Sequence, residues 1–260
     1  MKIVIAISYD GTNYFGWQRQ DGETTVEGTI EDTLKYIFHK DIDIMGASRT
    51  DAGVHSNGSI AVFDIDTKIP ADRISYVINK YLPEDIRIIF SKEIQSDFNI
   101  RKTKTEKTYT YRISLNRIES PTLRLYYHTV HTPLLINEMK KAKKYLEGTH
   151  DFKSFSSTKT NVKNFVRTIS EIKIEIEKPE NEFPNKVAIS VTGNGFLYNM
   201  VRIIVGTLIE VGQGKIKADD IKTILLERDR TKAGHTAPAK GLTLERSVFP
   251  EIGIDTDRFR

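Results

Sequence analysis

The first 91 residues carry apolar patterns of two periods in a fixed order, and that order restricts the folds open to the chain. The segments with strand or helix periodicity follow one another as strand 2–8, helix 26–37, strands 42–47 and 59–65, helix 71–81 and strand 85–91. This β-α-β-β-α-β order is typical of ferredoxin-like domains, which pack both helices on one face of an antiparallel sheet. We therefore expect the opposite face to be free to meet a ligand.

The second half of the chain repeats this order with insertions. Expected strands cover residues 107–116, 125–131, 166–177, 186–192 and 242–249, and expected helices cover 137–146, 196–211 and 220–228. The polar, basic segment 99–105 is the best boundary between the halves. The sequence therefore predicts two domains, residues 1–100 and 105–250, in an α+β fold of two ferredoxin-like, or RRM-like, βαββαβ subdomains.

The composition is that of a globular protein with a substantial core, because 38% of the 260 residues are hydrophobic and 28% are charged. The absence of cysteine excludes disulfides and thiolate metal sites, and it fits a reducing cytoplasm. The six histidines do not cluster and no carboxylate spacing indicates a metal cage, so we expect no metal. The longest apolar run, 201–211, is too short and too polar to span a bilayer, so we expect no membrane partner.

The distribution of basic residues says more than the net charge, which is only +4. Local clusters occupy residues 101–104 and 140–144, and further basic side chains follow at Lys153, Lys159, Lys163 and Arg167. Any one cluster is compatible with a solvated surface. Several clusters in the middle third of the chain favour a nucleic acid as partner.

The candidate for chemistry is Asp51, in the string Ser-Arg-Thr-Asp-Ala-Gly-Val-His at residues 48–55. Its carboxylate lies between Arg49 and a small-residue turn, where the Ala-Gly pair would let backbone and ligand approach closely. A lone aspartate in a loop is more often an Asx-turn or a cap. The residue type alone therefore leaves a structural role open.

The whole string resembles the catalytic loop of the TruA family of tRNA pseudouridine synthases, usually written Gly-Arg-Thr-Asp-Ala-Gly-Val-His, and it departs only at Ser48. Further segments of the chain resemble other motifs of the same family in the same order: residues 9–12 with 16–20, 107–112, 194–202 and 237–242. Such ordered matches are far more specific than any one of them.

The resemblance implies an activity and a partner. Members of this family isomerise uridine to pseudouridine at positions 38, 39 and 40 of tRNA, in the anticodon stem-loop. They work as homodimers with the RNA crossing both subunits. The implied fold joins the two antiparallel sheets into a continuous sheet with a central catalytic cleft. The reaction breaks the C1′–N1 bond, turns the base and forms a C1′–C5 bond, without redox or phosphoryl chemistry, so no cofactor is expected.

The resemblance also assigns catalytic roles. Asp51 would be the nucleophile at C1′ or C6 of the uridine. Burial would raise the pKa of its carboxyl unless a cation paired with it, and Arg202 would be that cation. The phenol of Tyr109 would cover the base and help to move the C5 proton. Taken alone, Arg202 is also compatible with a surface arginine, and Tyr109 with a half-buried strand aromatic.

The implied RNA contacts begin with Arg49, which would enter the RNA stack where the base leaves. The residue alone is also compatible with a phosphate contact. A duplex base must be extruded before chemistry, at a cost of a few kcal/mol. The other expected RNA contacts lie in the basic boundary segment and in the N-terminal match: Arg101, Lys102, Gln18 and Arg19.

Two alternative functions fit parts of the sequence. A non-catalytic RNA-binding module with two RRM-like units would explain the fold, but the usual recognition-motif aromatics are missing and Asp51 would have no purpose. A carboxylate hydrolase such as a glycosidase would need a second carboxylate in the site. The candidate for that role is Asp10, which lies in a turn signal.

Overall fold

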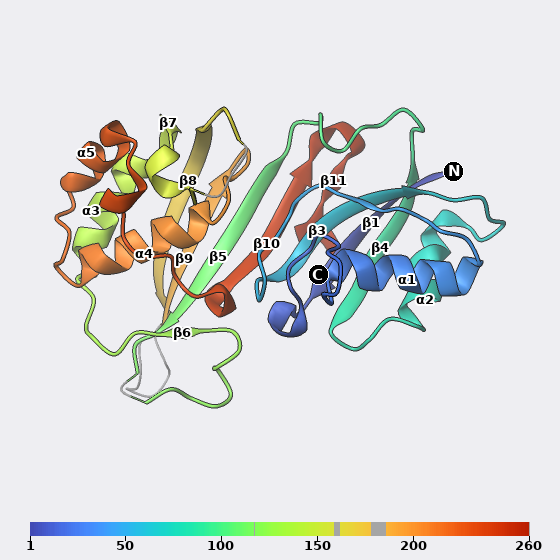
Figure 1. Cartoon of the computed structure of the whole chain (residues 1–260), viewed down its shortest axis with the longest axis horizontal. Helices are drawn as coiled ribbons and strands as arrows, with labels where there is room; N and C mark the ends of the chain where they lie inside the picture. Colours follow the sequence, from blue (N-terminus) through green and yellow to red (C-terminus); the bar gives the residue numbers. More distant parts are fainter. Residues whose placement is uncertain (117, 159–161, 178–185, 260) are drawn as a thin grey trace. The chain divides into compact units, whose positions relative to one another are not determined.

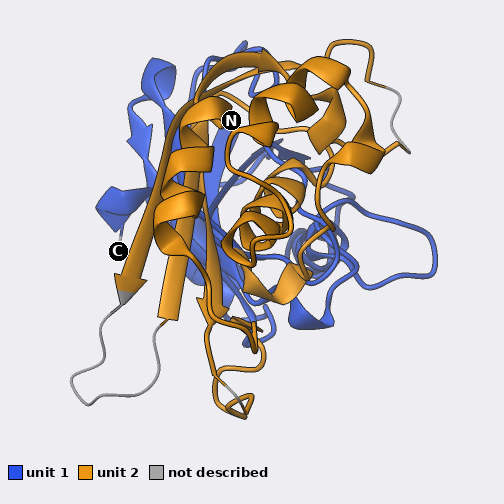
Figure 2. Ribbon diagram, turned by 90° about the vertical axis from the view of Figure 1, so that its left-hand side faces the viewer, with its two compact units in different colours: residues 1–105, 243–260 blue, residues 106–242 orange. Residues whose placement is uncertain are grey.

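The computed structural model describes residues 1–116, 118–158, 162–177 and 186–259, and its helices and strands are labelled in Figure 1. The chain forms two compact units, Met1–Thr105 with Thr243–Arg260 and Glu106–Leu242 (Figure 2). The first unit therefore takes its residues from both ends of the chain. The final strand, expected within the domain 105–250, lies mostly in the first unit.

Backbone pairing explains the place of this strand, β10 (Leu242–Phe249). It runs parallel to β3 (His55–Asp64), with Thr243 opposite His55, and antiparallel to β11 (Ile254–Asp255). Phe249 is fully buried in a core cluster of the first unit. The alternation of residues identifies a strand but does not identify its partner.

The sheet of the first unit is built around β1 (Lys2–Tyr9), which is antiparallel to both β3 and β4 (Ile86–Ile94). The short β2 (Met45–Gly46) is antiparallel to β3. All these pairings except β3 with β10 are antiparallel. The connections between β2 and β3 and between β10 and β11 are short, as antiparallel pairs allow, whereas longer stretches of chain separate β1 from β3 and β4.

Two helices, α1 (Val26–Phe38) and α2 (Ile74–Asn79), contribute to the same core of the first unit. The hydroxyl of Thr25 caps α1 by accepting a hydrogen bond from the Gly28 N–H at 3.2 Å. Apolar side chains of both helices are fully buried with the odd-numbered face of β1: Ile30, Leu34, Ile74 and Ile78 with Ile3, Ile5 and Ile7. Helical spacing predicted the stripe of α1. The predicted stripe of the helix 71–81 is realised at Ile74 and Ile78, whereas Tyr81, which continues it at i+7, lies beyond the end of α2 and is 53% exposed.

The opposite face of β1 is not open at its centre, so the expectation of a free face is wrong there. Val4 and Ala6 on that face are fully buried. Val4 and Ala6 belong to a second core. It also contains residues from the segment after β4 and from β10 and β11: Phe98, Ile100, Phe249 and Ile254. The physical reason is that both faces of β1 are apolar, so each must be covered.

The second unit contains a sheet in the order β5 (Glu106–Ser114), β9 (Lys186–Gly193), β8 (Val166–Glu177) and β7 (Gly148–Asp151). These neighbours are antiparallel. The short β6 (His128–Thr129) is parallel to β5.

Three helices complete the second unit: α3 (Ile136–Leu146), α4 (Met200–Gly212) and α5 (Asp220–Glu227). Helix α3 packs against α4 and β8, and three of its apolar side chains are fully buried: Met139, Ala142 and Leu146. Short 3₁₀ turns cover Gly11–Asn13, Ala71–Arg73, Lys153–Phe155, Arg230–Lys232, Ala239–Gly241, Pro250–Ile252 and Thr256–Phe259.

Some expected elements are shorter in the structure. The strand expected at 42–47 is reduced to β2, because the Ile44 N–H donates to the Glu31 carboxylate at 3.1 Å instead of to a neighbouring strand. The strand expected at 125–131 is reduced to β6. The helix expected from 196 begins at Met200, because Asn199 has a left-handed φ of 60°.

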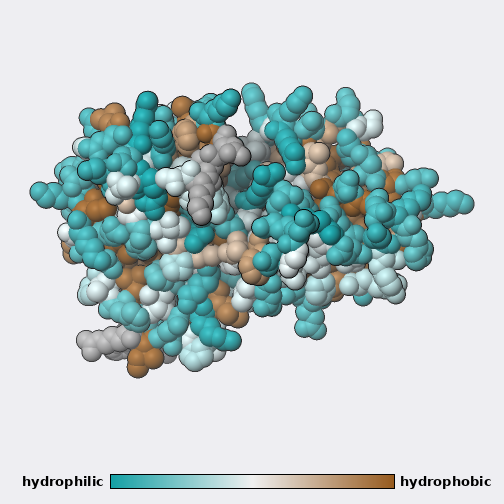
Figure 3. Space-filling view, viewed as in Figure 1, coloured by the Kyte–Doolittle hydropathy of each residue, from teal (hydrophilic) through white to brown (hydrophobic). Residues whose placement is uncertain are grey.

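The fold is mixed α+β, with largely antiparallel pairing in both units, as the sequence predicted. Hydrophilic side chains cover most of the face drawn in Figure 3. Within the described residues, the structure contains no helix with the length and apolar character needed to cross a membrane.

Candidate active site

Asp51 lies in a tight turn between β2 and β3, in the segment 48–55 that we call the Asp51 loop. The Val54 N–H donates to the Asp51 carbonyl at 3.1 Å and closes the turn. Gly53 has a φ of 75°, in the left-handed region that favours glycine. Asp51 itself is half-buried, whereas the preceding Thr50 is buried. The turn therefore holds the carboxylate at the surface of the first unit on a fixed backbone.

Residues 9–20, here called the N-terminal motif, bind the backbone of the Asp51 loop on both sides of the aspartate. The Trp17 N–H donates to the Thr50 carbonyl at 3.1 Å. The Gly53 N–H donates to the Tyr14 carbonyl at 3.2 Å. The two family-like segments are therefore parts of one structure, which explains why they occur together in the sequence.

Two glycines of the N-terminal motif allow this close approach. Gly16 has a φ of 89°, and a Cβ there would lie 2.6 Å from the Thr50 carbonyl oxygen. A Cβ at Gly11 would lie 2.0 Å from the Val54 carbonyl oxygen. Larger residues at either position would push the Asp51 loop away.

Asp10, the second carboxylate considered for a hydrolase, serves a turn. Its Oδ1 accepts from the Thr12 N–H at 3.0 Å, as the turn signal in the sequence predicted. The same oxygen lies 3.0 Å from Nδ1 of the buried His55. The Gly11 N–H donates to that ring nitrogen at 3.1 Å. Asp10 therefore caps the turn at Gly11–Asn13, and the buried ring of His55, at the end of the Asp51 loop, accepts a hydrogen bond from that turn.

In the second unit, Tyr109 lies on β5 opposite Val191 of β9 and is buried, with 7% of its surface exposed. The ring of Phe196 meets it edge-on, with centroids 5.2 Å apart and planes at 87°. Two matched segments, 107–112 and 194–202, therefore meet in this aromatic pair. The contact fixes the plane of the tyrosine ring.

Arg202 lies in the first turn of α4, which is buried along its length except at Arg202 and Glu210. Its Nε donates to the Ala237 carbonyl at 2.7 Å, and its Nη1 donates to Oδ1 of Asn199 at 2.8 Å. The Ala237 N–H returns a bond to the Arg202 carbonyl at 3.1 Å. The left-handed backbone of Asn199 and the segment 237–242 thus hold the guanidinium in one orientation. This is not the environment of a loose surface arginine.

The matched motifs therefore form two clusters, one in each unit: residues 9–20 with 48–55, and 107–112 with 194–202 and 237–242. The sequence model of tRNA pseudouridine synthases matches residues 5–101 and 142–250, which include most of both clusters. The chain belongs to the tRNA pseudouridine synthase family. The resemblance seen in the sequence is thereby confirmed.

Relatives in this family align along almost the whole chain. It is 43% identical over 248 residues to tRNA pseudouridine synthase A of Thermoanaerobacter sp. (strain X514), covering 95% of this chain and 99% of the relative. It is 46% identical over 243 residues to tRNA pseudouridine synthase A of Acetivibrio thermocellus, covering 94% and 97%. The protein of that name from Clostridium acetobutylicum is 45% identical over 249 residues, covering 95% and 99%.

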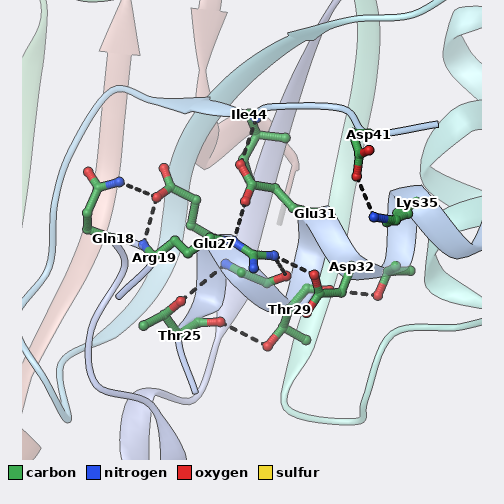
Figure 4. A network of polar contacts seen from close by, with 12 residues as sticks. Gln18, Arg19, Thr25, Glu27, Thr29, Glu31, Asp32, Lys35, Asp41 and Ile44 are labelled. Carbon is green, nitrogen blue, oxygen red and sulfur yellow. Dashed lines mark hydrogen bonds and ion pairs between the residues drawn. The ribbon is translucent and has the colours of Figure 1, made fainter. Parts of the chain in front are cut away.

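The residues expected to contact RNA in this pseudouridine synthase lie in different surroundings. Arg49, Arg101 and Lys102 are exposed. Gln18 and Arg19 instead turn toward α1 (Figure 4). The Arg19 guanidinium pairs with Glu31 at 2.7 Å and also with Asp32, and the Gln18 amide donates to Glu27.

The other basic clusters are partly neutralised. On α3, Lys141 pairs with Asp219 and Lys143 pairs with Glu147, at 2.8 and 2.7 Å. Lys140 and Lys144 are exposed on the same helix. Lys159 lies outside the described residues. The positive electrostatic potential at the surface of α3 is therefore weaker than its number of lysines implies.

Sequence reasoning missed the burial of charged residues in this family member, among them Lys107 and Glu27. Lys107 lies two residues before Tyr109 on β5, and burial lowers the pKa of its ammonium to about 8. Glu27 lies on α1 and is 5% exposed. A signal was present for Glu27, since it shares the i, i+3, i+7 spacing of Ile30 and Leu34, the inward stripe.

In the ranges 1–116, 118–158, 162–177 and 186–259, no three histidines or carboxylates gather in a group that could hold a metal ion.

Proposed function

We propose that the chain isomerises uridine to pseudouridine in tRNA. The observation that carries this proposal is membership of the family along almost the whole chain, combined with the rigid backbone around Asp51. The N-terminal motif binds the Asp51 loop through bonds that a purely RNA-binding surface would not require. We therefore favour an enzyme over an RNA-binding module.

In this proposal the Asp51 carboxylate attacks C1′ as the C1′–N1 bond breaks and the uracil leaves as an anion at N1, or it adds to C6 and is eliminated after the base has moved. The base then turns, and its C5 bonds to C1′; on the C1′ route, this displaces Asp51. Loss of the C5 proton and protonation of N1 give pseudouridine and restore the Asp51 carboxylate. Arg202 keeps Asp51 ionised, and the bonds to Ala237 and Asn199 support this role because they leave the guanidinium little freedom. Tyr109 covers the base and helps to move the C5 proton. The chemistry needs no cofactor, and we propose none.

The proposed substrate is the anticodon stem-loop, with uridines 38, 39 and 40 as targets and with Arg49, Arg101 and Lys102 at the RNA. Their exposure supports these contacts. We include Gln18 and Arg19 at the edge of this surface, with the charge of Arg19 largely offset by α1. The enzyme would work in the cytoplasm, in keeping with its cysteine-free sequence.

We also propose the finer fold assignment, two ferredoxin-like subdomains. In the first unit, support comes from the neighbours β4, β1, β3 and β2 and from two helices in one core. In the second unit, support comes from the antiparallel order β5, β9, β8 and β7. The continuous sheet and central cleft stay predictions.

A homodimer is proposed from the family resemblance and from charge. A net charge of +4 is a weak field for one subunit that binds a folded tRNA, and two subunits double it. Light scattering at the working concentration tests this part. A fully active monomer would refute the dimer and leave the chemistry of Asp51 unaffected.

The test of the main proposal uses tRNA that carries tritium at C5 of uridine. A pseudouridine synthase releases this label to water, because the new glycosidic bond forms at C5. An RNA-binding module would retain tRNA on a filter and release nothing. A hydrolase would release free base. The proposal fails if the purified protein binds labelled tRNA and releases no label above background.

A further inference from the structure

Glu27 receives hydrogen bonds from three consecutive residues of the N-terminal motif. Its Oε1 accepts from Nε1 of Trp17 at 3.1 Å. Its Oε2 accepts from the Arg19 backbone N–H at 2.8 Å and from the Gln18 side-chain amide (Figure 4). The backbone N–H of Glu27 also donates to the Trp17 carbonyl at 2.9 Å. The first turn of α1 is thus bonded to residues 17–19.

Trp17 connects this carboxylate to the Asp51 loop. Its indole is 1% exposed. A Cβ at Gly46 of β2 would lie 2.4 Å from its Nε1, so the ring fills the space beside that strand. Its backbone N–H donates to the Thr50 carbonyl, one residue before Asp51. A continuous chain of bonds therefore runs from Glu27 through Trp17 and Thr50 to the backbone of Asp51, all inside the first unit.

The hydrogen bonds of Glu27 suit its ionised form. Burial and the negative charge of Glu31 raise the pKa of its carboxyl, while hydrogen bonds from the Arg19 N–H and the Trp17 indole and the nearby charge of Arg49 oppose the shift. A carboxylate offers acceptor sites to all three donors, whereas a protonated acid would point its own O–H at one of them. Burying an ionisable group for packing alone would be unfavourable.

We propose that Glu27 is a positioning residue for Asp51. It holds residues 17–19 against α1, and through Trp17 it fixes the distance and direction of the Asp51 loop. This inference rests on the proposed function of Asp51. Glu27 contacts neither the nucleotide nor the reacting carboxylate in this proposal, and it acts through Trp17 and the backbone of the Asp51 loop.

The first experiment uses Trp17, which is the chain's single tryptophan, so intrinsic fluorescence reports on this contact without any substrate. In Glu27→Ala, the emission should shift to longer wavelength and acrylamide should quench it more strongly than in the unaltered protein. In Asp32→Asn, both should stay unchanged. Asp32 is the matched control because it lies on the same helix, is exposed, and has Arg19 as its one described ion-pair partner. It makes no described bond to Trp17.

The second experiment measures label release from tRNA for the same proteins. Glu27→Ala should lower kcat by about 10²-fold, with KM almost unchanged, because a small displacement of a reacting group has an effect of this size. Glu27→Gln should recover most of the rate, within about tenfold of the unaltered protein, because its amide oxygen still accepts from the Arg19 N–H. Asp32→Asn should retain full activity.

The outcomes separate this inference from the proposed function. If the unaltered protein releases no label, the function fails, and the fluorescence shift still tests the Glu27–Trp17 contact. If Glu27→Ala keeps the full kcat, or changes only KM, the positioning role is wrong. Should Glu27→Ala not fold, Trp17→Phe replaces it, since that change removes the indole bond and keeps the backbone bonds. An unaltered kcat in Trp17→Phe would then overturn the proposal.

Discussion

The hydroxyl groups of Tyr9 and Thr50 lie 2.8 Å apart in the interior of the first unit. Burial raises the pKa of Tyr9 to about 12, so its hydroxyl keeps its proton at neutral pH. The end of β1 is thereby joined to the residue before Asp51. This bond adds a side-chain link to the backbone bonds through which the N-terminal motif holds the loop.

Replacing this tyrosine tests the link. Tyr9→Phe should lower the free energy of unfolding by about 1–3 kcal/mol, because it leaves the buried Thr50 hydroxyl without this partner. It should also lower kcat for label release more than it changes tRNA binding. Chemical denaturation and filter binding measure the two effects. A stable variant with unaltered kcat would show that the backbone bonds suffice to place Asp51.

Asp51→Asn should abolish turnover and leave folding and tRNA affinity nearly unchanged. The amide has almost the same shape but lacks the nucleophilic oxygen charge. Label release, thermal melting and filter binding of one preparation check the three statements. Turnover above a trace would refute the nucleophile assignment, and loss of folding would make Asp51 a structural residue.

The hydrogen bonds described for Arg202 predict a graded series of kcat values. Arg202→Lys keeps a positive charge but cannot reproduce both bonds, to Ala237 and to Asn199. Arg202→Ala loses the charge and the bonds together. Each hydrogen bond from a charged donor contributes about 1.5–3 kcal/mol to the free energy of unfolding. We expect kcat to fall in the order Arg, Lys, Ala, with a smaller change in tRNA affinity. A loss of affinity alone, with a shallower salt dependence, would instead identify a phosphate contact.

Two glycines with positive φ form a matched pair for testing the close approach. Gly16 has a φ of 89° and faces the Thr50 carbonyl, whereas a Cβ at Gly22, with a φ of 77°, would meet no described atom within 4 Å. Both alanine variants carry the backbone penalty, roughly 1–2 kcal/mol. Only Gly16→Ala adds the clash, so it alone should lower kcat strongly. Equal kcat values for the two variants would contradict the proposed contact between motif and loop.

Lys107 predicts a pH dependence of stability. Its pKa is about 8 in the folded protein, against an ordinary 10.5, so between these values the unfolded chain binds more protons. The free energy of unfolding therefore rises as the pH increases from about 8 to 10.5. Below about pH 8 the buried ammonium is charged, and its destabilising effect is complete. Lys107→Met should raise the Tm at pH 7, and the difference from the unaltered protein should narrow above pH 8. A difference that stays constant with pH would refute this.

The sequence predicted those parts of the fold whose causes are local. Helix α1 was predicted because Thr25 caps it and because Ile30 and Leu34 share one face. The strand expected at 42–47 was not realised in full, because the Ile44 N–H bonds to Glu31 on a distant turn of α1. No periodicity encodes such a bond.

The same contrast holds for the candidate site. The Asp51 string was identified by its residues, but the bonds from Tyr14 and Trp17 that hold it join backbone atoms far apart in sequence. The restraint on Arg202 depends on the left-handed backbone of Asn199, a residue for which the sequence predicted an ordinary helical conformation. Motifs locate reacting groups, whereas their orientation depends on tertiary contacts.

The unit that carries Asp51 takes strands β10 and β11 from the last residues of the chain. During synthesis on a ribosome, this unit stays incomplete until Phe249 and the segment after it have left the exit tunnel. A hydrogen bond from the Ser247 N–H to the Thr256 hydroxyl, at 2.9 Å, then attaches the turn Thr256–Phe259 to β10. A nascent chain halted before residue 243 would thus lack Phe249 and Ile254, and it would leave part of the apolar face of β1 and β3 uncovered.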